Sequence, residues 1–262
     1  MLSKLLILRA FLFEKDWWHI LWKNPFTLHE TYHKMHSQAL GREIEYLVFG
    51  NWGYPVVVFP TSMGRYFENK DFKLVESARW LVESGKIKLY CIDSIDKESW
   101  YAKHLHPSHR VLNHILYDRM LHEEFVPRVK WECNVEKVGA AGCSFGGYHA
   151  LNFAFRHPEQ VAYLFSMGGA FDIKSHLGGY HDENVYFNCP PDFIPDAHNA
   201  HFYQMKIVLG TSEHDFCRGD NEWMSGILHK KGIGHWLDIR PGATHDWPVW
   251  REMFPDYLSR IG

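Results

Sequence analysis

The chain has 262 residues, of which 46% are hydrophobic, 16% aromatic and 23% charged, and its formal net charge is −3. This composition excludes a disordered chain, and the length suits one large α/β domain, or two small ones, with a sizeable core. The small net charge gives no electrostatic reason to expect a nucleic-acid partner, and no run of 18 apolar residues predicts a membrane span.

The five cysteines are odd in number and include no C-x-x-C pair, which argues against a disulfide framework and for a reducing compartment. The apolar stretch Leu5–Phe13 has some likeness to a signal peptide. However, Arg9 interrupts it and Phe13–Trp17 offers no small-residue cleavage site. We therefore expect a cytoplasmic protein in which residues 1–30 form an amphipathic extension packed on a domain of residues 31–262.

Short apolar runs alternate with helical periodicity along most of the chain, which predicts one doubly wound α/β domain. The first two strands should form a hairpin across Leu40-Gly41. The expected strands are Thr31–Ala39, Arg42–Phe49, Pro55–Phe59, Ile87–Ile92, Val138–Ala141, Val161–Met167, Met205–Leu209 and Trp236–Ile239. The expected helices are Phe72–Val82 (closed by Gly85), Ser108–Val126, one that follows Gly142–Gly146 and is stopped by Pro158, Asn221–Lys231 and Trp247–Arg260.

The helix over Ser108–Val126 is expected to bury one apolar face. That face would comprise Val111, Leu112, Ile115, Leu116, Met120 and Leu121.

The connection before this helix, Asp93–His109, holds His104, His106 and His109, which are potential metal ligands. No carboxylate or cysteine accompanies them at the spacing of a metal site, so a solvated histidine-rich loop is the better interpretation. We expect neither a metal nor another cofactor.

The segment Lys137–Tyr148 contains Gly142-Cys143-Ser144-Phe145-Gly146, which has the form G-x-S-x-G. A small-residue strand precedes it and a helical pattern follows, with Ala150, Leu151, Ala154 and Phe155 on one buried face. This context is typical of a nucleophile elbow, which holds a serine on a strained strand-to-helix turn. Glycine suits Gly142 and Gly146 because these two positions crowd each other in such a turn. Ser144 is therefore the candidate nucleophile.

A serine needs a base to take its proton and an acid to hold that base, in the chain order Ser, acid, His. His245 follows the last predicted strand and opens the last helix, with Asp246 as its cap. The acid has three candidates. Asp215 and Glu213 lie after the strand ending near Leu209, and Asp172 follows the preceding strand. Asp215 ranks first because it lies deeper in its loop, followed by Glu213 and then Asp172.

The oxyanion of an acyl-transfer intermediate needs two backbone donors. Phe145 N–H, directly after the nucleophile, should be one. The other should come from the loop after Pro55–Phe59, with Ser62 N–H first and Thr61 or Met63 as alternatives.

Phe171–Tyr203 has no clear period and is rich in Gly, Pro, Asn, His and aromatic residues. A stretch this long inside a domain is usually functional. We expect a cap-like excursion, at about residues 171–205, that covers the site and sets acyl-group choice.

Four segments carry a resemblance to a known family: Gly-Cys-Ser-Phe-Gly-Gly, Phe-Pro-Thr-Ser-Met-Gly-Arg, Gly-Tyr-His-Asp-Glu-Asn-Val-Tyr-Phe-Asn and His-Asp-Trp-Pro-Val-Trp. From about Thr31 to the C-terminus the chain resembles bacterial putative esterases of the esterase D-like branch of the α/β-hydrolases. Feruloyl esterases and S-formylglutathione hydrolases are relatives of that branch. The resemblance implies an α/β-hydrolase fold, no cofactor, and a triad of Ser144, Asp215 and His245. The first thirty residues fall outside it, the excursion matches only in part, and the substrate stays open.

The sequence thus predicts a serine esterase that acts on a small-molecule acyl ester or thioester. A non-catalytic binding or scaffold protein that retains the fold is the alternative from another class. A metal-dependent hydrolase using the histidine-rich loop ranks third. The oligomeric state stays open.

Overall fold

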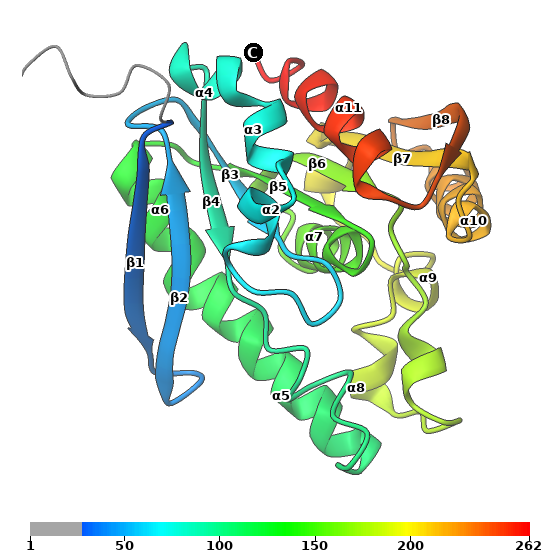
Figure 1. The fold of residues 1–262 in the computed structure, drawn as a ribbon. Helices are drawn as coiled ribbons and strands as arrows, with labels where there is room; N and C mark the ends of the chain where they lie inside the picture. The colour runs from blue at the N-terminus through cyan, green and yellow to red at the C-terminus, as the bar shows by residue number, and fades with distance from the viewer. Residues whose placement is uncertain (1–27) are drawn as a thin grey trace, which may run out of the picture.

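A computed structural model describes residues 28–262, so the prediction for an extension over residues 1–30 lies almost wholly outside the described residues. Eight strands form one sheet in the order β1-β2-β4-β3-β5-β6-β7-β8 (Figure 1). β1 pairs with β2, and β2 with β4, in antiparallel fashion. All other neighbours are parallel. This is the predicted mostly parallel sheet with an N-terminal hairpin, the arrangement of an α/β-hydrolase.

The strands are β1 (Glu30–Ser37), β2 (Arg42–Phe49), β3 (Tyr54–Phe59), β4 (Ile87–Ile92), β5 (Val138–Cys143), β6 (Val161–Met167), β7 (Lys206–His214) and β8 (His235–Thr244). All eight were predicted, and β2, β4 and β6 match the predicted bounds. β7 and β8 continue further than predicted, because their apolar residues give way to polar ones while the pairing runs on through Ser212 and Arg240. Glu213 consequently lies within β7, and not in a loop after it.

The longer helices are α5 (Pro107–Met120), α6 (Val126–Cys133), α7 (Phe145–Arg156), α10 (Arg218–Lys230) and α11 (Trp247–Leu258). The shorter ones are α2 (Glu68–Asp71), α3 (Leu74–Ser77), α4 (Arg79–Glu83), α8 (Glu183–Tyr186) and α9 (Pro190–Phe193), with a π-turn η1 (Leu121–Phe125) and 3₁₀ turns η2 (Ile173–His176) and η3 (Ala200–Gln204). No helix within residues 28–262 is long and apolar enough to cross a membrane.

Apolar clusters lie on both faces of the sheet. On one face, side chains of η1, α6, α7 and α10 pack against strand residues such as Val57 and Ala140. On the other, α3, α4 and α11 pack against residues such as Val56 and Val58. Burial on both faces explains why β3 is wholly apolar, as predicted. A third, smaller cluster joins Trp100, Phe145 and Tyr148 to the segment after β6.

The prediction of one continuous helix over Phe72–Val82 is wrong, because the segment forms two short helices. The two are α3 and α4, which are separated at Ala78 (φ −101°, ψ 10°). The left-handed Lys73, whose φ is 63°, separates α3 from the preceding α2. Neither residue has helical dihedral angles, so no single helix runs through these positions. The prediction that Gly85 closes the segment is confirmed, since Gly85 has a φ of 72° and directly follows Ser84, the C-cap of α4.

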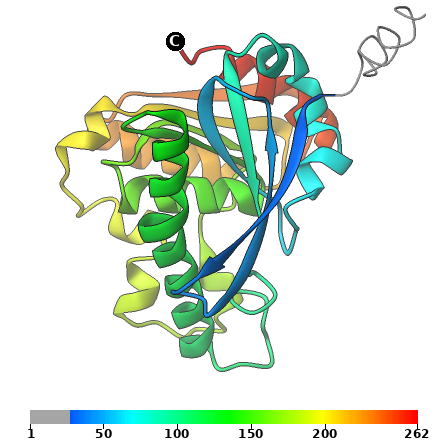
Figure 2. The same cartoon turned by 90° about the vertical axis from the view of Figure 1, so that its left-hand side faces the viewer.

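The predicted helix over Ser108–Val126 is present as α5 and η1, but it continues through η1 into α6 (Figure 2). Its predicted apolar face is only partly correct, because Leu112 and Leu116 are exposed. Polar side chains take their place in the interior, among them His114 and Asp118. Asp118 pairs with His157, and His114 Nε2 lies 3.2 Å from Asn152 Nδ2, while His114 Nδ1 has no partner among the described residues. Burial here therefore follows polar contacts and not the apolar period.

The excursion over Phe171–Tyr203 contains the short elements η2, α8, α9 and η3, and it lies beside the first part of α5 (Figure 1). Many of its apolar side chains are buried, including Ile173, Val185 and Ile194. It is therefore an integral layer of the fold.

Candidate active site

Ser144 lies in the turn between β5 and α7 and has a strained backbone. Its φ of 54° and ψ of −122° lie in a region that residues other than glycine rarely adopt, at a cost of about 1–3 kcal/mol. The turn is fixed because Ser144 N–H donates to the Met167 carbonyl (2.8 Å) and the Ser144 carbonyl accepts from Gly147 N–H (2.9 Å). The half-buried serine is thereby held at the carboxyl edge of the sheet.

The two glycines of the G-x-S-x-G motif are required by packing. A Cβ on Gly142 would lie 2.2 Å from the Gly146 carbonyl oxygen, which confirms the predicted crowding. A Cβ on Gly146 would lie 2.5 Å from the Pro60 carbonyl oxygen. Backbone atoms cannot rotate away from such contacts. The loop after β3 is therefore pressed directly against the first turn of α7.

His245 approaches Ser144 from the turn after β8. Its Nε2 lies 2.9 Å from Ser144 Oγ, and its Nδ1 lies 2.7 Å from Asp215 Oδ1. The His245 and Asp215 side chains are only 8% and 1% exposed. A carboxylate at Nδ1 favours the tautomer that carries its proton there, which leaves the Nε2 lone pair facing the serine hydroxyl. Asp246 caps α11 through Trp247 N–H (2.7 Å), as predicted.

The other two acid candidates make different contacts. Glu213 Oε2 accepts from Gly242 N–H (2.9 Å) at an exposed position. Asp172 Oδ1 accepts from Lys174 N–H (2.9 Å) and caps η2. Neither carboxylate forms a hydrogen bond with His245, so only the first-ranked candidate lies where an acid is needed.

Asp215 is packed so closely that a neighbouring glycine is needed. Its Oδ1 also accepts from Cys217 N–H (2.7 Å). A Cβ on Gly168, whose φ is 61°, would lie 2.8 Å from Asp215 Oδ2 and 3.0 Å from His245 Nδ1. Gly168 thus leaves room for the Asp–His pair. Gly168 was not among the predicted site residues, although the pair Gly168-Gly169 directly after a strand is a signal in the sequence.

The amides of the two predicted oxyanion donors, Phe145 and Ser62, have no acceptor among the described residues. Phe145 N–H is the first of α7, and helix geometry gives it no intrahelical partner. Ser62 lies in the loop between β3 and α2, the loop that contacts Gly146 through Pro60.

The amides on either side of Ser62 are occupied. Thr61 N–H donates to Glu68 Oε2 (2.7 Å), and Met63 N–H donates to Asp96 Oδ2 (3.0 Å). Of the three donors that the sequence left open, Ser62 N–H is therefore the one left free for a ligand. Glu68 and Asp96 were both missed in the sequence, although Asp96 lies in the connection after β4 and Asp215 in the connection after β7.

Aromatic rings lie beside these groups. Tyr101 OH donates to Ser62 Oγ (2.8 Å), and the Tyr101 ring contacts those of Phe145 and His176, with centroids 5.5 and 4.7 Å away. Burial lowers the pKa of His176, which keeps this ring neutral at pH 7. Phe216 is 80% exposed and lies 4.0 Å from the His245 ring, centroid to centroid. These rings give the site an aromatic border.

Two groups of potential metal ligands occur within residues 28–262, namely His122–His157–Glu159 and Asp215–Cys217–His245. In the second, burial and then the charge of Asp215 raise the pKa of the Cys217 thiol to about 12. A protonated thiol is a poor ligand. His104, His106 and His109 belong to neither group.

The sequence profile of a family described as "Putative esterase" matches residues 37–261. A search of curated proteins finds no significant match.

Several solved structures resemble the fold. A ferulic acid esterase has a TM-score of 0.72 and 17% identity, covering 90% of this chain and 100% of its own. An S-formylglutathione hydrolase from Agrobacterium tumefaciens has a TM-score of 0.70 and 14% identity over 90% of this chain and 99% of its own. The fluorophosphonate-binding serine hydrolase F from Staphylococcus aureus has a TM-score of 0.65 and 15% identity, covering 89% of this chain and 98% of its own. At these identities the likeness establishes the shared fold.

Gly168→Ala should lower kcat/KM by on the order of 10²-fold, because the new methyl group displaces the Asp215–His245 pair from its alignment. Gly178→Ala is the matched control, since its φ of 58° imposes the same backbone strain but no atom lies within 4 Å of the position that the new methyl group would take. Ester hydrolysis and thermal unfolding should be measured for both variants. Equal activity in the two would show that the pair tolerates the methyl group.

Proposed function

The chain belongs to the Putative esterase family and is a carboxylic ester hydrolase, and we propose that it cleaves small acyl esters or thioesters through an acyl-enzyme on Ser144. His245 acts as the base and Asp215 holds it. The observation that carries this proposal is the pair of contacts at His245, 2.9 Å to Ser144 Oγ and 2.7 Å to Asp215 Oδ1.

In the proposed acylation step, Ser144 Oγ attacks the carbonyl carbon of the ester while its proton passes to His245 Nε2. The carbonyl oxygen gains the negative charge and accepts hydrogen bonds from the Phe145 and Ser62 amides. When the tetrahedral intermediate collapses, the bond to the alcohol or thiol breaks and His245 gives its proton to the leaving oxygen or sulfur.

Deacylation repeats these steps with water as the nucleophile. His245 takes one proton from the water, and the water oxygen attacks the acyl carbon. The proton then passes from His245 to Ser144 Oγ as the bond between this oxygen and the acyl carbon breaks and the carboxylic acid leaves. In both halves the imidazolium of His245 is stabilised by the Asp215 carboxylate, which is almost fully buried and therefore little screened by solvent.

The border of the site supports small acyl esters as the substrate class. Phe216 offers an exposed apolar surface beside His245, and we infer that the departing group passes there. The rings of Tyr101 and His176 lie on the side of the Ser62 and Phe145 amides. Through His176 the excursion would contact the acyl group, which is how we propose that it influences acyl choice.

All five cysteines are free thiols. We infer a reducing compartment, and propose the cytoplasm.

Ser144→Ala should remove ester hydrolysis, by on the order of 10⁴-fold or more, without loss of folding, because the change deletes only the attacking oxygen. Cys143→Ala is the matched control. Cys143 is fully buried, and burial raises its thiol pKa well above the usual value, so this variant should keep most activity. Labelling with a fluorophosphonate probe should be lost only in the serine variant. If the Ser144→Ala variant were labelled and the Cys143→Ala variant were not, Cys143 and not Ser144 would be the nucleophile.

Asp215→Asn should reduce kcat by about 10⁴-fold, because an amide no longer favours the Nδ1–H tautomer of His245. Glu213→Gln and Asp172→Asn remove carboxylates of the same region that make no contact with His245, so their rates should stay near that of the native chain. Steady-state kinetics of the three variants tests the assignment. A large loss in either control would move the acid to that residue.

His176→Ala should change the ratio of kcat/KM for bulky against short acyl esters, because it removes a ring packed against Tyr101 and Phe145. His181→Ala, at an exposed position of the same excursion, is the control. A series of p-nitrophenyl esters of increasing acyl length measures the ratio. If both variants give the native ratio, the excursion does not contact the acyl group through His176.

A further inference from the structure

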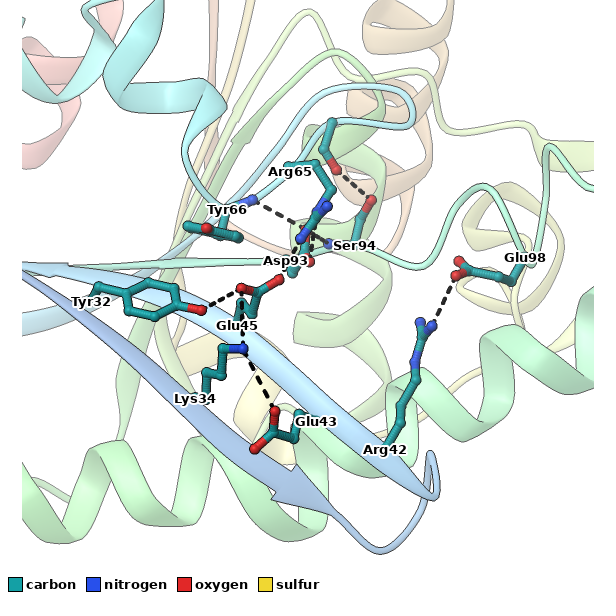
Figure 3. Close-up of polar contacts among 11 residues, drawn as sticks. Tyr32, Lys34, Arg42, Glu43, Glu45, Arg65, Tyr66, Asp93, Ser94 and Glu98 are labelled. Carbon is teal, nitrogen blue, oxygen red and sulfur yellow. Dashed lines mark hydrogen bonds and ion pairs between the residues drawn. The ribbon is translucent and has the colours of Figure 1, made fainter.

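The loop from Pro60 to Tyr66 is held in place by side chains that take no part in the proposed proton transfers. Arg65 donates to Asp93 through Nε (2.8 Å) and also pairs with Glu45 on β2 (Figure 3). Tyr66 N–H donates to Asp93 Oδ1 (3.2 Å), and Ser94 OH donates to the Gly64 carbonyl (2.8 Å). These contacts hold the second half of the loop, beyond Ser62.

The part of the loop next to Ser62 depends on different residues. Thr61 donates to Glu68 through both its N–H (2.7 Å) and its hydroxyl (3.0 Å). Met63 has a φ of 56°, a conformation that its side chain disfavours, and its N–H donates to Asp96. The Met63–Asp96 bond thus holds a strained residue directly beside the free Ser62 amide.

Asp96 connects this loop to the helix that begins at the nucleophile. It is 1% exposed, and its two oxygens divide their bonds: Oδ2 accepts from Met63 N–H, while Oδ1 lies 2.8 Å from His149 Nε2. His149 is 3% exposed and lies on α7 one turn after Phe145, whose ring it contacts at a centroid distance of 5.1 Å. A buried carboxylate is costly unless such donors satisfy it. Asp96 is therefore bound tightly to both sides.

From this geometry we propose that Asp96, held by His149, is a positioning residue that fixes the Ser62 amide relative to the Phe145 amide. The inference rests on the proposed function, in which both amides stabilise the oxyanion. A stable oxyanion pocket requires donors that are already in place when the charge forms. The Phe145 amide belongs to α7, and the Ser62 amide belongs to the loop after β3. Asp96 is hydrogen-bonded to the helix through His149 and to the loop through Met63.

Asp96→Ala should lower kcat for p-nitrophenyl acetate by on the order of 10²-fold while KM changes little, because the oxyanion forms only in the transition state. Asp96→Asn should stay within about five-fold of the native kcat, since its amide oxygen still accepts from Met63 N–H and its amide nitrogen can donate to His149.

Asp118→Ala is the matched control. Asp118 is also buried and also bonded to a histidine, His157 (2.9 Å), but it lies on α5 near the far end of α7. Its loss should lower the unfolding temperature and leave kcat unchanged. If Asp96→Ala does not fold, Asp96→Glu replaces it, because the longer side chain cannot keep both bonds and should also reduce kcat.

The possible outcomes distinguish failure of the positioning role of Asp96 from failure of the proposed function. Native kcat in Asp96→Ala, or a loss that appears only in KM, would overturn the positioning role while ester turnover stands. An equal fall of kcat in the Asp96 and Asp118 alanine variants would also overturn it, in favour of general destabilisation. A native chain that neither hydrolyses p-nitrophenyl acetate nor reacts with a fluorophosphonate would instead refute the proposed function, and the positioning role with it.

Discussion

The backbone of Ser144 is the constraint on which the rest of the site depends. A serine with a φ of 54° is stable only where the surroundings prevent its relaxation. The Met167 carbonyl holds its N–H, and the glycines on both sides allow β5, α7 and the loop after β3 to approach within contact distance. The same close approach brings the Ser62 loop against the first turn of α7. The strained turn therefore places the proposed nucleophile, and the close approach packs the loop of the proposed Ser62 donor against the helix that begins with the Phe145 amide.

Three carboxylates, two buried and one half-buried, lie around this turn, and each accepts from a backbone amide. Asp215 holds Cys217 N–H, Asp96 holds Met63 N–H and Glu68 holds Thr61 N–H. Negative charge close to a developing oxyanion opposes catalysis, so a site built this way needs those charges engaged elsewhere. The histidine partners of Asp215 and Asp96 and the Thr61 hydroxyl that donates to Glu68 meet this need. Burial raises the pKa of Glu68. The carboxylates that hold the site are thus themselves hydrogen-bonded.

Features that depend on local pattern were predictable from sequence. Apolar runs predicted all eight strands, and the glycine spacing around Ser144 predicted the crowded turn. Features that depend on tertiary contacts were not. The interruptions at Lys73 and Ala78 and the exposure of Leu112 and Leu116 have no signal in the local pattern, and the inward network of His114 and Asp118 has no periodic signature. The residues that hold the Ser62 loop come from separate elements, so no spacing in the sequence joins them.

The excursion after β6 shows how the border of the site is tied to the stability of the fold. The His176 carbonyl accepts from Arg110 Nη1 (2.6 Å), and the Asn188 carbonyl accepts from Tyr148 OH on α7 (2.9 Å). Val185 and Ile173 complete an apolar cluster with Phe145. Replacing the whole segment would uncover this cluster and disturb the helix that begins at Ser144. Under the proposed function, single border rings such as His176 are therefore the positions at which acyl choice can be changed without exchange of the excursion as a unit.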